Sequence, residues 1–202
     1  ANSASYGGAI GNKGTLAVYD STVADNSAQA GGGIYVEDGC LTTALSNTIV
    51  AENTNTGSTS PDIYGVVTAN YCLIGATAGV VFSGLSGDNI LNVDPLLGVL
   101  GYYGGSTQTI PLLAGSPAID AGANALIPGG VTTDQRGYAR IIDGAVDIGA
   151  YELNDLSPFI VTTAQDIVDV TDALTSLREA IAAANSYAGA NTITFDSSLV
   201  GQ

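Results

Sequence analysis

The sequence contains no histidine, tryptophan or methionine, and only 4 lysine and arginine residues against 19 aspartate and glutamate residues. Without histidine, the chain lacks the commonest general base, the Ser-His-Asp arrangement and any metal site built on imidazole. Four cations cannot neutralise a track of phosphates, and a formal net charge of −15 argues against an anionic membrane surface. No stretch approaches the roughly 18 continuous apolar residues of a spanning helix. We therefore expect neither a nucleic-acid partner nor a membrane span.

The chain has two cysteines and no methionine at its start. Cys40 and Cys72 are too few for a disulfide framework, so they either pair with each other or remain buried thiols. Translation begins with methionine and this chain begins with Ala1, which predicts a processed or excised piece of a longer protein. No basic region followed by an apolar run is present, so any signal peptide is expected to be gone already.

What the chain does contain is enough apolar material for a core. Of its 202 residues 46% are hydrophobic and 11% are charged, which excludes a disordered acidic tail. The length suits one domain, or one domain and a fragment. Glycine is abundant, with 27 residues, and it recurs at regular intervals. This regularity directs attention to internal repeats.

A repeat of 24 to 27 residues runs through the first third of the chain. The glycine pair at Gly7 returns 24 residues later at Gly31, and Asn26 returns 27 residues later as Asn53. A weaker third pass begins at Asp62-Ile63-Tyr64-Gly65. Each pass holds short alternating apolar runs separated by Gly, Asn, Asp and Ser, which is typical of strands and turns. Few strong helix formers occur in this region, so stacked helix pairs are excluded.

This period with about three short strands in each pass predicts one coil of a parallel β-helix. Successive coils stack at the inter-strand spacing of about 4.8 Å, and like side chains then form ladders along the stack. We expect Val23 to lie over Ile49, followed by Cys72 or Leu73. Asn26 and Asn53 are expected at a turn, where their amides bond along the stack, and turn chemistry explains them better than a ligand does.

The C-terminal part has a different pattern. Residues 159–163 and 191–196 are predicted to be strands. Between them, Ser176 and Glu179 form a capping-box pattern that opens a helix reaching Ala184. Leu177, Ile181 and Ala184 share one face of this helix. The sequence thus predicts a strand-helix-strand unit.

The glycine rungs resemble the repeats of polymorphic outer-membrane and other bacterial surface β-helix proteins. Residues 47–152 also resemble the choice-of-anchor Q domain, which closes secreted bacterial right-handed β-helices. The motifs appear in the family's order and are Asn47-Thr48-Ile49-Val50-Ala51, Pro61-Asp62-Ile63, Cys72-Leu73-Ile74-Gly75, Asp94-Pro95-Leu96-Leu97-Gly98, Gly115-Ser116-Pro117-Ala118-Ile119-Asp120-Ala121-Gly122, Thr133-Asp134-Gln135-Arg136-Gly137 and Asp147-Ile148-Gly149-Ala150-Tyr151-Glu152. Each motif is weak alone, whereas seven in order are specific.

The resemblance implies an all-β fold, a right-handed parallel β-helix of the pectin-lyase-like solenoid type, with one short capping α-helix near the C-terminus. It also implies an extracellular or cell-surface location and no assigned catalytic chemistry. In that family Ser-Leu-Arg-Glu-Ala-Ile followed by Ile-Thr-Phe-Asp begins a β-helix, whereas here it stands at the C-terminal end. We therefore expect residues 1–153 to end one module with its closing region, 154–158 to be a linker, and 159–202 to resemble the head of the next module.

Charged residues of the closing region are the first group of candidate sites. We interpret them as arginine–carboxylate bonds that hold the cap together, formed by Arg136, Arg140, Asp120, Asp134, Asp147 and Glu152. The alternative is a site for acidic sugars, in a carbohydrate-active β-helix enzyme or an inactive polysaccharide-binding relative. The Gly-His-Gly motif of pectin-cutting β-helix glycosidases is impossible here, and no catalytic residue is assigned. No cofactor is expected; structural calcium is the one metal whose hard oxygen ligands the chain supplies, although both the EF-hand and the nonapeptide patterns are missing.

The second group is apolar and belongs to the C-terminal part. A β-helix end is an unpaired edge, and natural proteins cover such edges. We expect an assembly segment to cover or extend the uncapped start of a neighbouring copy by strand addition. Its residues are Phe159, Ile160, Val161, Leu177, Ile181, Ile193 and Phe195. The predicted function is thus a structural or adhesive module, not an enzyme, whose copies join head to tail into a fibre.

Overall fold

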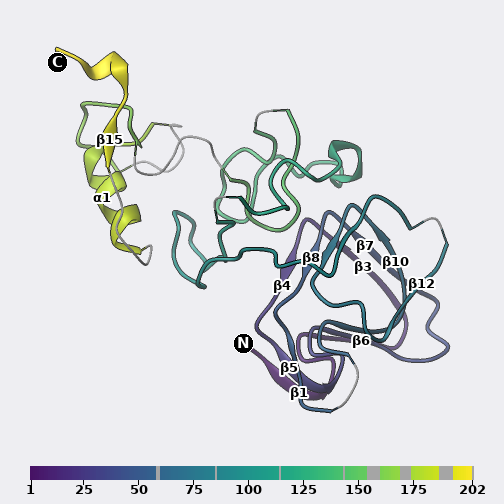
Figure 1. The fold of residues 1–202 in the computed structure, drawn as a ribbon. Coiled ribbons are helices and arrows are strands. Elements are labelled where there is room, and N and C mark those ends of the chain that lie inside the picture. Colours follow the sequence, from purple (N-terminus) through teal and green to yellow (C-terminus); the bar gives the residue numbers. More distant parts are fainter. Residues whose placement is uncertain are drawn as a thin grey trace.

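The computed structural model describes residues 1–57, 60–84, 86–113, 115–142, 144–153, 160–168, 174–186 and 193–201. Short strands stack in successive coils over the first 91 residues, and irregular chain follows up to residue 153 (Figure 1). A small strand-helix-strand unit forms the C-terminal part. The expected linker, residues 154–158, and Phe159 lie outside the described residues.

The coils are built from strands of two to eight residues. Coil 1 contains β1 (Ser3–Tyr6), β2 (Ile10–Asn12), β3 (Thr15–Tyr19) and β4 (Thr22–Val23). Coil 2 contains β5 (Ser27–Ala30), β6 (Ile34–Val36), β7 (Thr42–Ser46) and β8 (Ile49–Val50). Coil 3 contains β9 (Thr54–Asn55), β10 (Ile63–Asn70) and β11 (Leu73–Ile74), and a partial coil 4 contains β12 (Val80–Phe82) and β13 (Ile90–Leu91).

Every pairing between these strands is parallel, and each strand pairs with its counterpart in the next coil. The sheet orders are β1-β5-β9, β2-β6-β10-β7-β3 with β12 also on β10, and β13-β11-β8-β4. The third coil has the expected three strands, because β10 runs without a break, whereas coils 1 and 2 each have four strands, one more than expected. The fold is a parallel β-helix with one short helix near the C-terminus, which confirms the predicted fold class.

The repeated glycines are required where successive coils approach each other. A Cβ on Gly8 would lie 2.1 Å from the carbonyl oxygen of Gly32, and a Cβ on Gly32 would lie 2.3 Å from that of Pro61. Gly7 and Gly31 have φ of +62° and +59°, a region that favours glycine. The glycine repeat therefore reflects backbone contact between coils.

The side-chain ladders differ from the prediction by one residue. Val23 lies over Val50, and Thr22 over Ile49, so the predicted ladder of Val23 over Ile49 is wrong. Val50 and Ile74 continue the inner ladder, which packs in the core of the coils. A shift of one residue moves a strand side chain to the opposite face. Ile49 and Leu73 consequently face outward.

That outward face is covered by the closing region, residues 92–153. Its buried side chains Leu112, Ala118 and Ile148 pack with Ile49 and Leu73 in a second core cluster. The region contains a 3₁₀ helix, η1 (Asn124–Leu126), and isolated antiparallel bridges such as Leu97 with Leu112. The closing region thus packs along the side of the coils, against the β4-β8-β11-β13 sheet.

The C-terminal segment, residues 160–201, contains β14 (Ile160–Val161), α1 (Leu177–Ser186), β15 (Thr194–Phe195) and η2 (Ser197–Leu199). β14 and β15 pair in parallel, with Ile160 opposite Thr194. The predicted capping box is confirmed: the backbone N–H of Ser176 donates to Oε2 of Glu179 at 2.8 Å, and that of Glu179 donates to Oγ of Ser176 at 3.3 Å. Both strands are shorter than predicted.

Candidate functional site

Arg140 is the centre of a buried ionic cluster, although arginine is rarely buried. Its side chain is 2% exposed. Nη1 donates to Oε2 of Glu152 at 3.2 Å, and Nη2 donates to the carbonyl oxygens of Asp147 and Gly149 at 2.9 and 2.6 Å. Nη2 also lies 3.6 Å from Oδ1 of Asp20 in coil 1. This guanidinium therefore bonds backbone and carboxylates that a turn would otherwise leave unpaired.

Arg136 lies in a second arrangement beside the first. Its Nε donates to Oδ2 of Asp134 at 2.8 Å, and its Nη2 donates to the carbonyl oxygen of Glu152 at 2.5 Å. The guanidinium carbon lies 3.5 Å from the ring centroid of Tyr151 and 4.6 Å from that of Tyr138. Two aromatic faces and a carboxylate thus enclose this cation.

Asp147 and Asp120, the other two predicted members of the cluster, form no ion pair with an arginine in the described part of the chain. The carboxylate of Asp147 accepts hydrogen bonds from the backbone N–H groups of Asp120 and Leu153. Asp120 enters the cluster through that N–H group, in a left-handed conformation with φ of +52°. The structure brings the six residues together, although only four of them form ion pairs.

Residues of coil 1 complete the cluster, and the sequence reasoning missed them. Asp20 pairs with Arg140, and Oγ1 of Thr22 accepts the backbone N–H of Ala150 at 3.1 Å, across 128 residues of chain. Asn47 of coil 2 donates to Asp20 and accepts from the N–H of Ala123. In the sequence only the residue types pointed to turns: Asp20 and Asn47 both adopt the left-handed conformation, with φ of +43° and +46°, which aspartate and asparagine tolerate.

Burial changes the acid-base behaviour of these carboxylates. Burial, together with the nearby charge of Asp147, raises the pKa of Glu152 to about 7, against the lowering effect of its hydrogen bonds and of Arg140. Burial likewise raises the pKa of Asp147. Neither guanidinium is open to solvent, since the side chains of Arg136 and Arg140 are 5% and 2% exposed. The arrangement suits cross-linking of the fold, because both guanidinium groups are almost completely enclosed by the protein.

Metal and thiol chemistry have little support in the described residues. Within them, no group of three or more histidine, cysteine, aspartate or glutamate side chains is placed to hold a metal ion. Both cysteines are free thiols, and burial raises the pKa of Cys72 to about 11. A thiol with such a pKa is a poor nucleophile at neutral pH.

An asparagine ladder runs along the coils, as predicted for Asn26 and Asn53. Oδ1 of Asn26 accepts both the backbone N–H and the side-chain amide of Asn2. Oδ1 of Asn53 accepts the backbone N–H and the side-chain amide of Asn26, and Oδ1 of Asp62 accepts the same two groups of Asn53. Asp62, an acceptor, thus ends the ladder, and burial raises its pKa while its bonds to Asn53 lower it. Asn2 forms the other, exposed end.

Coil 1 lies at one end of the stack of coils among the described residues. Each of its strands β1, β2, β3 and β4 is the last strand of its sheet. A tyrosine stack ends there as well: the rings of Tyr35 and Tyr64 lie 5.1 Å apart, and Tyr6 covers Tyr35 at 5.0 Å while remaining 60% exposed. Three kinds of ladder, made of backbone, amides and rings, therefore run together along the coils and include coil 1.

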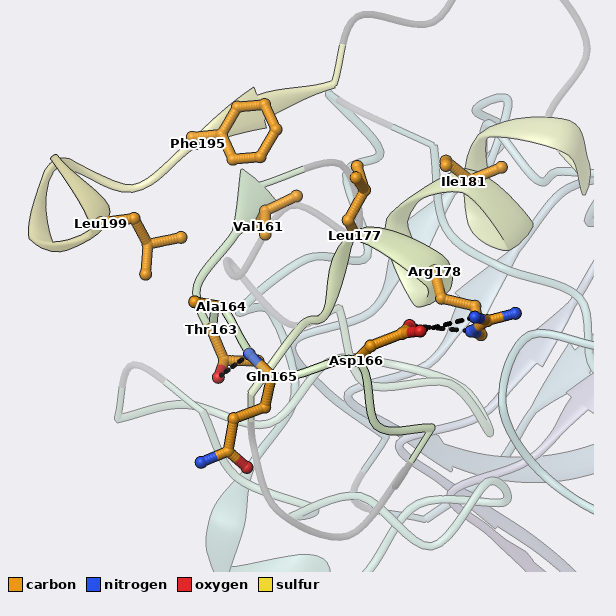
Figure 2. A pocket seen from close by; sticks show the side chains of 10 residues that line it. All are labelled: Val161, Thr163, Ala164, Gln165, Asp166, Leu177, Arg178, Ile181, Phe195 and Leu199. Carbon is orange, nitrogen blue, oxygen red and sulfur yellow. Dashed lines mark hydrogen bonds and ion pairs between the residues drawn. The ribbon is translucent and has the colours of Figure 1, made fainter. Parts of the chain in front are cut away.

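The C-terminal segment carries a groove of about 590 Å³ (Figure 2). Its lining residues are Val161, Thr163, Ala164, Gln165, Asp166, Leu177, Arg178, Ile181, Phe195 and Leu199. Four of the predicted assembly residues are among them; Ile160 and Ile193 are half-buried nearby in sequence. Arg178 and Asp166 form a two-pronged ion pair at 2.8 and 2.6 Å on its wall. The groove is thus apolar with a locally balanced charge.

No helix within the described ranges is long and apolar enough to cross a membrane. Comparisons of the chain with protein-family models, with curated proteins and with solved structures found no match.

Proposed function

We propose that this chain is a structural and adhesive module of a large secreted or cell-surface bacterial β-helix protein, and that its copies associate end to end into a fibre. The observation that carries the proposal is the way in which successive coils are joined. Parallel backbone ladders, the asparagine ladder and the tyrosine stack each continue from one coil to the next, so that one coil is a template for another. A neighbouring copy whose strands continued these ladders would lengthen the rod through the same kinds of contact.

The buried cluster supports a mechanical role. Arg140, Asp20 and Glu152 join the closing region to coil 1, so the side of the rod and its first coil are held as one body. A rod that bears load keeps its shape when cross-links of this kind join distant parts of the chain. Catalysis instead requires groups that a substrate can reach. The resemblance to bacterial surface β-helix proteins agrees with this role.

The experiment is sedimentation velocity of the full chain over a wide concentration range, followed by electron microscopy. End-to-end association predicts particles whose length grows with concentration at constant width. The net charge of −15 predicts stronger association at higher salt, because screening weakens repulsion between copies. Compact monomers at every concentration and salt would contradict the proposal.

A second candidate is binding of a polysaccharide, and one cavity favours it. A cavity of about 390 Å³ lies between coil 1 and the closing region, lined in part by Tyr19, Asp20 and Gln135. Asp20 and Arg140 both line this cavity, and among the described residues Oδ2 of Asp20 and Nε of Arg140 are buried polar atoms without a hydrogen-bond partner. A hydroxyl that reached both atoms would accept from Nε–H of Arg140 and donate to Oδ2 of Asp20.

A panel of neutral and acidic polysaccharides, tested for binding and cleavage, separates the two candidates. Saturable binding that Tyr19→Ala abolishes supports the cavity, and cleavage that Arg136→Ala abolishes supports an enzyme. A structural role predicts that Arg136→Ala lowers stability and that no polysaccharide is bound or cut.

A further inference from the structure

The stack of coils finishes at coil 4, where the chain leaves the stack and continues as the closing region. β12 pairs with β10 on one side, and in the part of the chain that the structure describes no strand pairs with its other side (Figure 1). That side is here called the coil 4 edge. It results from the path of the chain itself, because residues 92–153 turn aside to pack along the coils rather than over coil 4.

The backbone of β12 presents hydrogen-bonding groups along the coil 4 edge. In a parallel pair of strands, the N–H and C=O groups of alternate residues bond to the same neighbour. Ser83 donates to the carbonyl oxygen of Val67 at 2.8 Å, and Gly65 donates to that of Gly79 at 3.0 Å, so alternate residues from Gly79 to Ser83 bond to β10. The N–H and C=O groups of Phe82 therefore point away from β10. An occupant of this edge must supply a strand.

Apolar side chains reach the same edge. Phe82 lies over Val67 of the buried core and is 37% exposed. Val80, on the same side of the strand, packs on that core and is only partly buried. Val81, on the outward side, is 55% exposed. The coil 4 edge thus leaves one end of the apolar core partly open to solvent.

The charge distribution favours a second copy of this chain as the occupant. Residues 63–87 include β12 and the strand beneath it and contain no charged side chain, although 11% of the chain is charged. A basic or acidic partner would therefore find no opposite charge on these strands. Two chains of charge −15 repel each other, and they meet most easily through uncharged surfaces. A strand edge also complements itself, since two copies of one strand can pair antiparallel about a twofold axis.

We infer that the coil 4 edge of one copy binds the coil 4 edge of a second copy. The two β12 strands run antiparallel, and Phe82 lies opposite Phe82 of the second copy, so that the N–H of each donates to the carbonyl oxygen of the other. The two phenyl rings then cover the open ends of both cores. Because the contact is isologous, it closes as a pair. The inference goes beyond the proposed fibre, in which such a pair would be the repeating unit.

The test uses full-length variants that place a charge where the two copies meet. Phe82→Asp and Phe82→Lys each set like charges opposite each other across the twofold axis. Val168→Asp is the matched control, because Val168 is 63% exposed and lies in the C-terminal segment. Val81→Asp is a further variant in case substitution of Phe82 disturbs coil 4, and circular dichroism checks the folding of each chain.

We expect Phe82→Asp, Phe82→Lys and Val81→Asp each to weaken pairing at least tenfold, and Val168→Asp to leave it unchanged. An equal mixture of Phe82→Asp and Phe82→Lys should form one-to-one dimers, because the aspartate of one copy then lies opposite the lysine of the other. Only a surface that meets itself produces this rescue. Sedimentation velocity of the separate variants and of their mixture measures it.

Two results overturn the coil 4 contact while leaving the fibre in place: association as strong as wild type in the Phe82 and Val81 variants, or loss of association that the mixture does not restore. Wild-type dimers that never grow longer overturn the fibre and leave the coil 4 contact in place. A wild-type chain that stays monomeric at every concentration overturns both. The failures of the two proposals are therefore distinguishable.

Discussion

Nη2 of Arg140 lies 3.6 Å from Oδ1 of Asp20, so an ion pair joins the closing region to the turn between β3 and β4. The pair is almost completely buried, with side chains 2% and 9% exposed. Glu152, twelve residues further along the closing region, bonds the same guanidinium. One arginine thus links three segments of chain. Its removal would leave two buried carboxylates without a cation.

Arg140→Ala is expected to destabilise the fold by roughly 3–5 kcal/mol, because it leaves buried carboxylates without a cation. Urea unfolding of the full chain measures the loss. Arg178→Ala is the matched control, since Arg178 and its partner Asp166 are 63% and 64% exposed. It should cost much less, because solvent screens an exposed ion pair. Equal losses in the two variants would contradict a structural role for the buried cluster.

Glu152 predicts a pH dependence with a definite sign. Its pKa is raised to about 7 in the folded chain from an ordinary value near 4.5, so the folded state holds this proton more tightly. Its contribution to stability is therefore present at about pH 4.5 and is lost as the pH rises towards about 7. Asp62 and Asp147, whose pKa values burial also raises, act in the same direction.

Glu152→Gln isolates that contribution. The difference in unfolding free energy between wild type and variant should change by roughly 1–2 kcal/mol between pH 5 and pH 8, the wild type losing more as the pH rises. Urea denaturation at a series of pH values measures this difference. A difference that does not vary with pH would show that Glu152 titrates as it does in the unfolded chain.

Asn53→Ala is expected to cost roughly 2–4 kcal/mol, since it leaves buried backbone groups of two coils unpaired. Asn53 accepts two bonds from Asn26 and donates to the carbonyl oxygens of Val23 and Ala51. Asn2→Ala makes the same change at the exposed end of the ladder and should cost less than about 1 kcal/mol. Thermal unfolding compares the two; a similar loss from both would mean that the ladder contributes little.

Gly32→Ala is expected to destabilise the coils by about 2 kcal/mol or more, because the added Cβ would meet backbone oxygens of coil 3 at 2.3 and 2.5 Å. Gly14→Ala is the comparison, because a Cβ at Gly14 meets no atom within 4 Å. Its effect should remain within about 0.5 kcal/mol. Tyrosine fluorescence during urea unfolding follows both variants, and an unaffected Gly32→Ala would show that the coils can separate slightly.

Particular residues show how much of the fold could be predicted from the sequence. The recurrence of Asn26 as Asn53 correctly predicted a bonded ladder, and Ser176 with Glu179 correctly predicted the start of α1. Val23 was assigned to the wrong ladder because the neighbouring rungs Thr22–Ile49 and Val23–Val50 both contain apolar residues. The 27-residue offset between Asn26 and Asn53 places Val23 over Val50, so the spacing at the turn predicts the observed register and the similarity of the apolar residues alone does not.

By itself, the sequence determined the features that depend on residues near in the chain or one repeat apart: the coils, the glycine contacts, the asparagine turns and the helix cap. These follow from backbone geometry and from spacing. Only the tertiary structure decided that the closing region covers the outward Ile49 and Leu73, and that Asp20 completes the Arg140 cluster. Those contacts join segments that no period relates, and the burial of charge that makes them strong exists only once the distant segments have packed together.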